Sequence, residues 1–194
     1  MKKIKIQAPG WLAVKHIYST NYNLRPENID ISLIVIHNIS LPPEEFENQK
    51  FGYINQLFTN CLNKNKHDYF KTIYDNKVSS HFLIQRNGVI IQYVSTYLRA
   101  WHAGISEFKD IKNCNDYSIG IELEGSDFCG FEDEQYSSLI QLIYSLKNYH
   151  TTLNYITSHS HIASNRKTDP GKFFNWKYLQ EEIKDFWDIN NIIV

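Results

Sequence analysis

The sequence lacks any long apolar run. No segment of its 194 residues reaches the roughly 18 consecutive apolar residues of a membrane-spanning helix. The opening stretch, MKKIKIQAPGWLAVKHIYST, carries early lysines but has no unbroken apolar segment of about 7–15 residues, which a secretory signal peptide needs. The sequence therefore predicts a protein of the cytoplasm that has no membrane partner.

Cysteine is scarce, with only Cys61, Cys114 and Cys129 in the whole chain. Their number is odd, and no two of them have the CxxC spacing of a metal-binding or redox pair. The sequence therefore excludes a disulfide framework and a zinc finger built on cysteine pairs. This use of cysteine is typical of a reducing compartment.

An excess of charge of either sign is also missing. The chain has 20 Lys and Arg against 21 Asp and Glu, a formal net charge of −1. No global positive field draws it to nucleic acid, so nucleic acid is not an expected partner. With 42% hydrophobic residues and no repeat or low-complexity tract, the chain has enough apolar surface for one sizeable core. We expect a single domain over residues 1–194.

Two segments have the composition of buried strands. SLIVIH (32–37) is a short apolar, β-rich run, typical of a strand that is buried on both faces, and it ends at His37. HFLIQRNGVIIQYVS (81–95) contains two β-rich runs around Arg86-Asn87-Gly88. Asn-Gly is a strong signal for a tight turn, so this segment predicts a β-hairpin.

A third strand is predicted by alternation. In YSIGIELEG (117–125) the apolar Ile119, Ile121 and Leu123 fall on one face. Glu122 and Glu124 fall together on the other face, next to Gly120. Two carboxylates therefore share one side of a strand.

Helices are predicted from apolar residues at helical spacing. In 132–150, with Asp133 as the cap, these residues are Tyr136, Leu139, Ile140, Ile143 and Leu146. In 175–187 they are Trp176, Leu179, Ile183 and Phe186. A third, weaker helix is expected over about 44–60, after Pro42-Pro43. Strands interleaved with helices predict an α/β fold with a mixed central β-sheet flanked by helices.

The stretch SHSHIASNRKTDPG (158–171) places two histidines, an arginine, a lysine and an aspartate close together. By itself it fits a polar surface loop as well as half of a metal site. A catalytic zinc needs three protein ligands of the His, Asp, Glu or Cys type. His37, at the end of a core strand, can supply one of them, and His159 and Asp169 the other two. Pro170-Gly171 would turn the chain directly after Asp169 and restrict its loop.

Five separate motifs make this site more specific. In chain order they are VIHNISLPPEEF, VSSHFLIQRNGVIIQYV, RAWHAGIS, CNDYSIGIELEGSD and RKTDPG. Together they resemble the zinc-dependent N-acetylmuramoyl-L-alanine amidases of the AmpD type, members of the amidase_2 and peptidoglycan recognition protein superfamily. The resemblance covers nearly the whole chain. HNISLPP and RKTDPG look closer to the cytoplasmic branch than to the secreted enzymes.

The resemblance implies roles for individual residues. One Zn²⁺ per chain would be held by His37, His159 and Asp169. Glu122 and Lys167 would form the catalytic pair, Glu122 as the proton carrier and Lys167 as the group that stabilises the oxyanion. Candidates for contact with substrate are Asn38, Trp101, His102 and Arg166.

His161 departs from the family pattern, because related proteins commonly have an acidic residue at this position. It lies two residues after His159, so in an extended segment both rings would project to the same side. We favour a surface position for His161, or contact with a metal ligand, over a role as a competing ligand.

The reaction implied by the resemblance is hydrolysis of the amide between the lactyl group of N-acetylmuramic acid and L-alanine. For the cytoplasmic branch, the expected substrate is a small soluble muropeptide of peptidoglycan recycling, such as a 1,6-anhydro-N-acetylmuramoyl peptide, and the expected enzyme is a monomer. The alternative is a non-catalytic module that binds muropeptide without cutting it. Such a module would be marked by loss of a metal ligand or of the acid–base residue, and the sequence keeps all of them.

Overall fold

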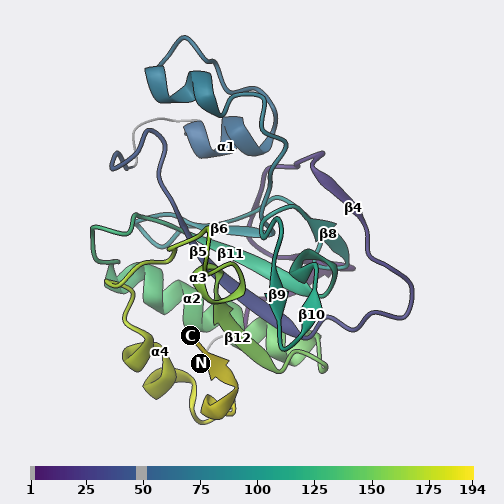
Figure 1. The fold of residues 1–194 in the computed structure, drawn as a ribbon. Coiled ribbons are helices and arrows are strands. Elements are labelled where there is room, and N and C mark those ends of the chain that lie inside the picture. Colours follow the sequence, from purple (N-terminus) through teal and green to yellow (C-terminus); the bar gives the residue numbers. More distant parts are fainter. Residues whose placement is uncertain (1–2, 47–51) are drawn as a thin grey trace.

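The centre of the protein is a seven-stranded mixed β-sheet (Figure 1). A computed structural model describes residues 3–46 and 52–194, and in it the strands lie in the order β13, β12, β5, β11, β6, β7, β3. Their bounds are β3 Lys15–His16, β5 Leu33–Ile39, β6 Phe82–Ile84, β7 Ile90–Gln92, β11 Ser118–Glu124, β12 Tyr155–Ser158 and β13 Ile192–Ile193. Only β6 and β7 pair antiparallel within this sheet. The predicted α/β fold with a mixed central sheet is confirmed.

Shorter elements surround this sheet. Three antiparallel pairs join β1 Ile6–Ala8 to β2 Trp11–Leu12, β4 Tyr22–Leu24 to β8 Leu98–Ala100, and β9 Glu107–Phe108 to β10 Ile111–Lys112. The helices are α1 Tyr53–Phe58, α2 Asp133–Tyr149, α3 His159–Ile162 and α4 Trp176–Ile183, with 3-10 turns η1 Asp68–Thr72, η2 Cys114–Asp116 and η3 Ile189–Asn191. Across residues 3–46 and 52–194, none of the helices is both long enough and apolar enough to cross a membrane.

Different elements cover the two faces of the sheet (Figure 1). On the first face, α2 and α4 bury one core cluster against β5 and β11, which includes Ile34, Ile36, Ile119, Ile121, Leu123, Leu139, Ile143 and Leu179. On the second face, a cluster around Val35 contains residues of the β9–β10 hairpin, η2 and α3. The segment of α1 and η1 packs on Leu83 and Ile91 of the β6–β7 hairpin in a third cluster. On the second face, the site lies between the cluster around Val35 and the α1–η1 segment.

The register of the parallel strands brings three polar residues to one level. Glu122 on β11 is directly beside His37 on β5. Ser158, the last residue of β12, is beside Ile36, so His159 follows at the level of His37. Aligned residues of neighbouring parallel strands point to the same face. His37, Glu122 and His159 therefore emerge side by side on the second face.

The predicted strands and hairpin are confirmed. β5 lies between two parallel neighbours, and its residues Leu33 to His37 are buried. The β6–β7 hairpin turns at Asn87-Gly88, where Gly88 has a φ of 78°, a conformation that favours glycine. In β11 every residue is buried, so the face that carries Glu122 is covered as well as the apolar face.

The predicted helices differ from the observed ones mainly at their ends. Asp133 is not the cap: α2 follows an N-cap at Glu132, whose main-chain N–H donates to Gln135 Oε1 at 3.1 Å in a capping box. The helix expected over about 44–60 is helical only at Tyr53–Phe58, and residues 47–51 of it lie outside the described residues. Glu44 has a φ of 65°, which a right-handed helix excludes, so within the described residues 42–46 no helix starts directly after Pro42-Pro43.

The C-terminal helix also stops earlier than its pattern. α4 ends at Ile183, and the chain then turns, with the main-chain N–H of Trp187 donating to the carbonyl of Ile183 at 2.9 Å. Leu179 and Ile183 are fully buried, as predicted, whereas Phe186 and Trp176 are only partly buried against the same core. The apolar spacing thus continues through a turn that is no longer helical.

Two buried histidines, His81 and His150, lie near the charge of the partly buried Arg25, whose Nη2 is 3.2 Å from Nε2 of His81. Burial and then the charge of Arg25 lower the pKa of His150 from 6.5 to about 4. The same two causes, in the same order, lower the pKa of His81 to about 3. The fold therefore holds both rings neutral at pH 7.

We expect this arrangement to destabilise the protein as the pH falls from 6.5 to about 4. Because the folded pKa of each ring lies below its unfolded value, the unfolded chain binds more protons in this range, and the free energy of unfolding falls with the pH. Above pH 6.5 the contribution is fully present. The melting temperature of His150→Gln should depend less steeply on pH over this interval than that of the wild type, and equal slopes would contradict the assignment.

Candidate metal centre

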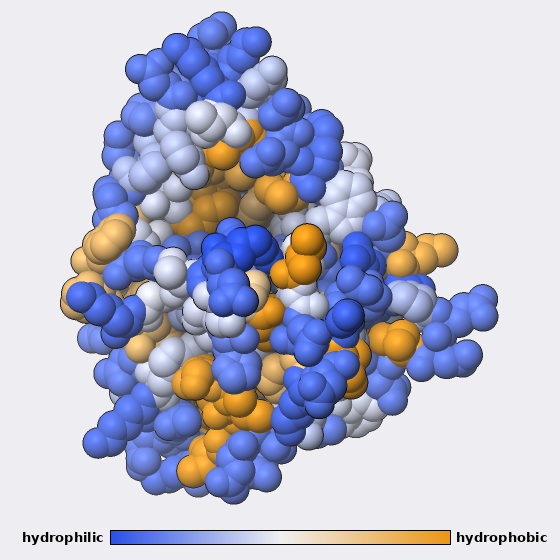
Figure 2. Space-filling model, viewed as in Figure 1, coloured by the Kyte–Doolittle hydropathy of each residue, from blue (hydrophilic) through white to orange (hydrophobic). Residues whose placement is uncertain are grey.

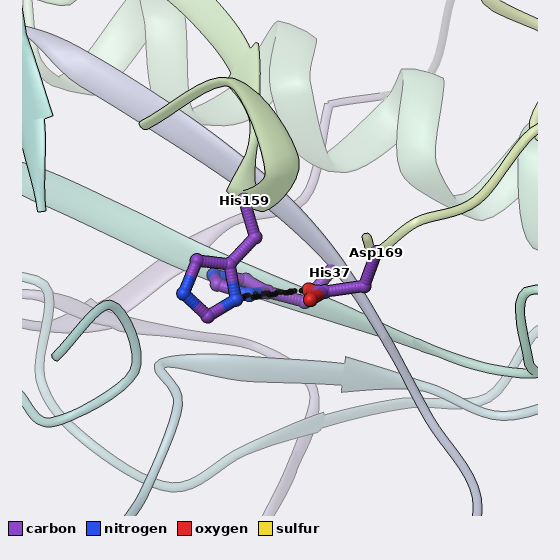
Figure 3. Close-up of side chains that lie close together, drawn as sticks. All are labelled: His37, His159 and Asp169. Atoms are coloured by element: carbon purple, nitrogen blue, oxygen red, sulfur yellow. Dashed lines mark hydrogen bonds and ion pairs between the residues drawn. The ribbon is translucent and has the colours of Figure 1, made fainter. Parts of the chain in front are cut away.

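His37, His159 and Asp169 form a compact group that could hold a metal ion (Figure 3). These three residues are called the metal group below. One ligand atom from each lies within 4.8 Å of those of the other two. Nδ1 of His37 is 2.9 Å from Nδ1 of His159 and 3.1 Å from Oδ2 of Asp169, which is 3.0 Å from Nδ1 of His159. Two imidazole nitrogens and a carboxylate oxygen converge on one point, so the group can hold a metal ion with a coordination position left open.

Each member of the group comes from a different kind of element. His37 lies near the end of β5, and His159 is the first residue of α3, whose N-cap Ser158 accepts a hydrogen bond from the main-chain N–H of His161. Asp169 lies in the loop after α3, where its carbonyl accepts from the N–H of Ser160 at 2.9 Å. Strand, helix and loop therefore supply one group each, and the hydrogen bond from Ser160 ties the loop to the helix.

The electrostatics of the group favour binding of a cation. Burial and then the nearby His159 lower the pKa of His37 to about 4, so its ring is neutral at pH 7 and keeps a lone pair. Burial alone would raise the pKa of Asp169, but hydrogen bonds with His159 and His37 outweigh it and hold the pKa well below its usual range. Asp169 is therefore ionised.

Glu122 and Lys167 lie on the wall of the same cavity as the group. Burial, and then the negative charge of Asp169, raise the pKa of Glu122 well above its usual value, while Lys167 opposes the shift. A raised pKa makes the carboxylate a better proton acceptor, as a general base needs. Glu124, two residues along the same strand, instead accepts from the main-chain N–H of Arg86 at 3.2 Å.

The cavity has a volume of about 380 Å³ and two unlike walls. One wall carries the histidines and carboxylates described above, and the other is formed by apolar side chains of the α1–η1 segment and its flanks, among them Leu57, Phe58 and Ile73. Figure 2 shows this hollow below the α1 segment, with apolar side chains at its base. The site therefore suits a ligand with a polar reacting group and an apolar part.

The residues expected to contact substrate occupy different places. Asn38 and Trp101 line the cavity. His102 also lines it, but both of its ring nitrogens face protein groups, His37 and Ser118. Arg166 is exposed, and its guanidinium donates to the carbonyls of Ala103 and Ile105 at 2.7 and 2.9 Å. Substrate contact remains a prediction for all four residues.

The geometry expected for His161 is wrong, because the segment is helical and not extended. α3 begins at His159, so two residues along a helix turn the side chain of His161 away from that of His159. His161 is exposed and its ring lies against Phe108 on the β9 strand. It is a surface residue, as favoured from the sequence.

Asp127, which was not predicted from the sequence, ties two parts of the site together. Asn38 Nδ2 donates to its Oδ1 at 2.7 Å, and Thr168 Oγ1 donates to its Oδ2. Asn38 follows His37 in the sequence, and Thr168 precedes Asp169. Gly171 packs so closely on Asp127 that a Cβ there would lie 2.6 Å from its Cα. Asp127 ends the CNDYSIGIELEGSD motif, but nothing in that spacing marks it as a link between distant segments.

Comparisons with known proteins agree with this geometry. Residues 27–172, which include the whole metal group, match the family model described as N-acetylmuramoyl-L-alanine amidase. The 1,6-anhydro-N-acetylmuramyl-L-alanine amidase AmpD of Haemophilus influenzae is 46% identical over 187 residues, which is 95% of this chain and 100% of the relative.

Solved structures are similar as well. A crystal structure of a selenomethionine derivative of AmpD matches with a TM-score of 0.87 and 43% identity, over 92% of this chain and 99% of that one. The amidase AmiD from Escherichia coli, solved with the substrate anhydro-N-acetylmuramic acid-L-Ala-D-gamma-Glu-L-Lys, matches with a TM-score of 0.58 and 28% identity. That match covers 81% of this chain and 60% of AmiD.

Proposed function

The chain belongs to the N-acetylmuramoyl-L-alanine amidase family, and from this premise we propose how its residues perform the reaction. The protein is an amidase of peptidoglycan recycling that hydrolyses the bond between the lactyl group of N-acetylmuramic acid and L-alanine in 1,6-anhydro-N-acetylmuramoyl peptides. One observation carries the assignment of the site: the metal group and Glu122 share one cavity.

The resident metal in this proposal is one Zn²⁺ per chain. Two neutral imidazoles and one ionised carboxylate are a donor set that zinc prefers, and three protein ligands are typical of catalytic zinc. His37, His159 and Asp169 would hold the ion. When bound, zinc supplies Lewis-acid polarisation of the scissile carbonyl and of the attacking water.

The residues around the metal group supply the remaining steps. The oxygen of the attacking water bonds to the carbonyl carbon, and Glu122 takes a proton from that water. Lys167 places its ammonium group near the carbonyl oxygen and stabilises the negative charge that develops there. The carbon–nitrogen bond then breaks, and Glu122 passes its proton to the amine of L-alanine. The products are the muramic acid carboxylate and the free stem peptide.

All the groups in this proposal come from one chain, so it needs no second subunit, and we propose a monomer that acts as a single domain. We place the reaction in the cytoplasm, because the HNISLPP and RKTDPG motifs look closer to the cytoplasmic branch. A non-catalytic recognition module is the rejected alternative. The curated relative that matches over 95% of this chain is an amidase.

The proposal is tested by incubating the purified protein with an anhydromuropeptide and identifying the products by mass spectrometry. We expect the free stem peptide, and we expect elemental analysis to find close to one zinc per chain. Dialysis against a chelator should remove both metal and turnover, and zinc should restore them. A protein that binds the muropeptide but releases no peptide, or that keeps full activity in chelator, contradicts the proposal.

We expect Lys167→Met to lower kcat by about 100- to 1,000-fold, the effect of losing one well-placed oxyanion donor. Methionine keeps the length of the side chain but removes its charge. Within the described residues, Lys167 takes no part in an ion pair. Zinc affinity and melting temperature should therefore change little.

The matched control is Lys172→Met, because Lys172 is exposed in the same loop and has no proposed role. It should leave kcat unchanged. A large fall in the zinc affinity of Lys167→Met, with activity restored by excess zinc, would instead make Lys167 a support for the ligand carboxylate.

A further inference from the structure

The two imidazoles of the metal group present the same atom, Nδ1, to their meeting point. Their other nitrogens, Nε2, both face residues 102–103. Nε2 of His159 is 3.1 Å from the carbonyl oxygen of Ala103, and Nε2 of His37 is 3.0 Å from Nδ1 of His102. Residues 102–103 therefore contact both rings at the nitrogens that point away from the meeting point.

These two contacts differ in how far they determine which ring nitrogen carries the proton. A carbonyl only accepts hydrogen bonds, so His159 carries a proton on Nε2, and the tautomer that this contact selects has its lone pair on Nδ1. His37 instead faces another imidazole, whose Nδ1 can donate or accept. If His102 donates, the neutral His37 must carry its own proton on Nδ1, where it blocks the metal position. If His102 accepts, His37 presents a lone pair there.

Ser118 can support the tautomer of His102 that metal binding requires, because its hydroxyl can accept a hydrogen bond as well as donate one. Its Oγ lies 3.1 Å from Nε2 of His102 and can accept a proton from that atom, which leaves Nδ1 of His102 free to accept from His37. We infer that His102, supported by Ser118, is a positioning residue that fixes the tautomer and orientation of His37 for metal binding. The inference rests on the proposed function, in which this group holds zinc.

The structure holds the ring of His102 in a close-fitting place. Gly120 lies under it, and a Cβ at Gly120 would be 2.5 Å from Cγ of His102. The rings of His37 and His102 meet edge to face, with centroids 5.1 Å apart and an interplanar angle of 83°. Glycine at this point of β11 is therefore what allows His102 to approach His37.

The backbone of the segment is fixed as well. The buried Asn115 accepts from the N–H groups of His102 and Ala103 at 3.1 and 2.8 Å, both on its Oδ1. Arg166 donates to the Ala103 carbonyl that also faces His159. Two residues expected to contact substrate, His102 and Arg166, thus support the histidines of the metal group.

The first test measures zinc affinity by competition with a chelating dye. His102→Leu keeps the bulk of the side chain but removes its acceptor, and zinc affinity should fall by about 10- to 100-fold. His102→Asn offers an amide oxygen near the position of Nδ1 and should recover most of that affinity. His150→Leu removes another buried histidine, outside the site, and should bind zinc like the wild type. Wild-type affinity in His102→Leu would overturn the inference.

The second test needs no variant, so it stands even if His102→Leu does not fold. Nitrogen-15 NMR of the histidine rings, recorded with and without zinc, identifies which nitrogen of each ring carries the proton. We expect His102 to carry it on Nε2, and a proton on Nδ1 would refute the inference. A wild-type protein that binds no zinc would refute the proposed metal site instead, while the metal-free spectrum would still report on His102.

Discussion

His37→Ala should lose bound metal and activity together. The substitution removes one of three groups in the metal centre, and the two that remain cannot enclose an ion from the strand side. Turnover should fall by at least about 1,000-fold, because a Lewis acid contributes several kcal/mol to the transition state and each 1.4 kcal/mol is about tenfold in rate. Zinc content after dialysis and the rate of release of stem peptide are measured on the same sample.

The matched control is His161→Ala, which removes an exposed histidine two residues from the metal group. It should keep zinc and activity. Because His37 is buried, His37→Gln is a second variant that retains volume, and circular dichroism checks that both variants fold. A folded His37 variant that still holds one zinc and cleaves substrate would remove His37 from the ligand set.

Glu122→Gln should abolish most turnover while zinc stays bound. Glutamine has nearly the same shape but cannot take the proton of the attacking water, so kcat should fall by about 100- to 10,000-fold. KM should change less, since proton transfer acts in the transition state. Burial is the main cause of the raised pKa of Glu122, so a neutral amide should not lower the melting temperature.

Glu124→Gln is the control for position, because Glu124 lies on the same strand and the same face. Its carboxylate is held by the main-chain N–H of Arg86, so its loss should affect stability more than kcat. If the two variants exchanged their behaviour, the proton carrier would be Glu124. If neither variant changed kcat, no carboxylate of this strand would carry the proton.

Much of the fold could be predicted because it depends on local patterns. The apolar run that became β5, the Asn-Gly turn after β6 and the apolar spacing of α2 each contain their own signal within a few residues. The α1 helix could not be predicted in the same way. Its N-cap is Gly52, which offers no side-chain capping group, so no cap signal in the sequence marks its start at Tyr53.

The sequence predicts which candidate ligands lie together, but not which residues hold them in place. His37, His159 and Asp169 were chosen because motifs in order resemble a family, and the structure brings them together. Asn115 and Asp127 lie inside the CNDYSIGIELEGSD motif, but the motif does not predict their roles. Their roles arise from hydrogen bonds between segments that are distant in the sequence, and such contacts exist only once the strands have taken their register.

The separation of the metal ligands along the chain decides when an ion can be acquired. His37 and His159 are 122 residues apart, and Asp169 follows His159 by 10. During synthesis on the ribosome, His37 therefore emerges long before His159 and Asp169. In an extended nascent chain these two residues are not yet available beside it. If these three residues hold the ion as proposed, it can enter only after translation has passed residue 169 and the sheet has formed. A fragment that stops before this point would lack the proposed site, however much zinc surrounds it, whereas an ion bound only by the folded protein would stabilise the folded state.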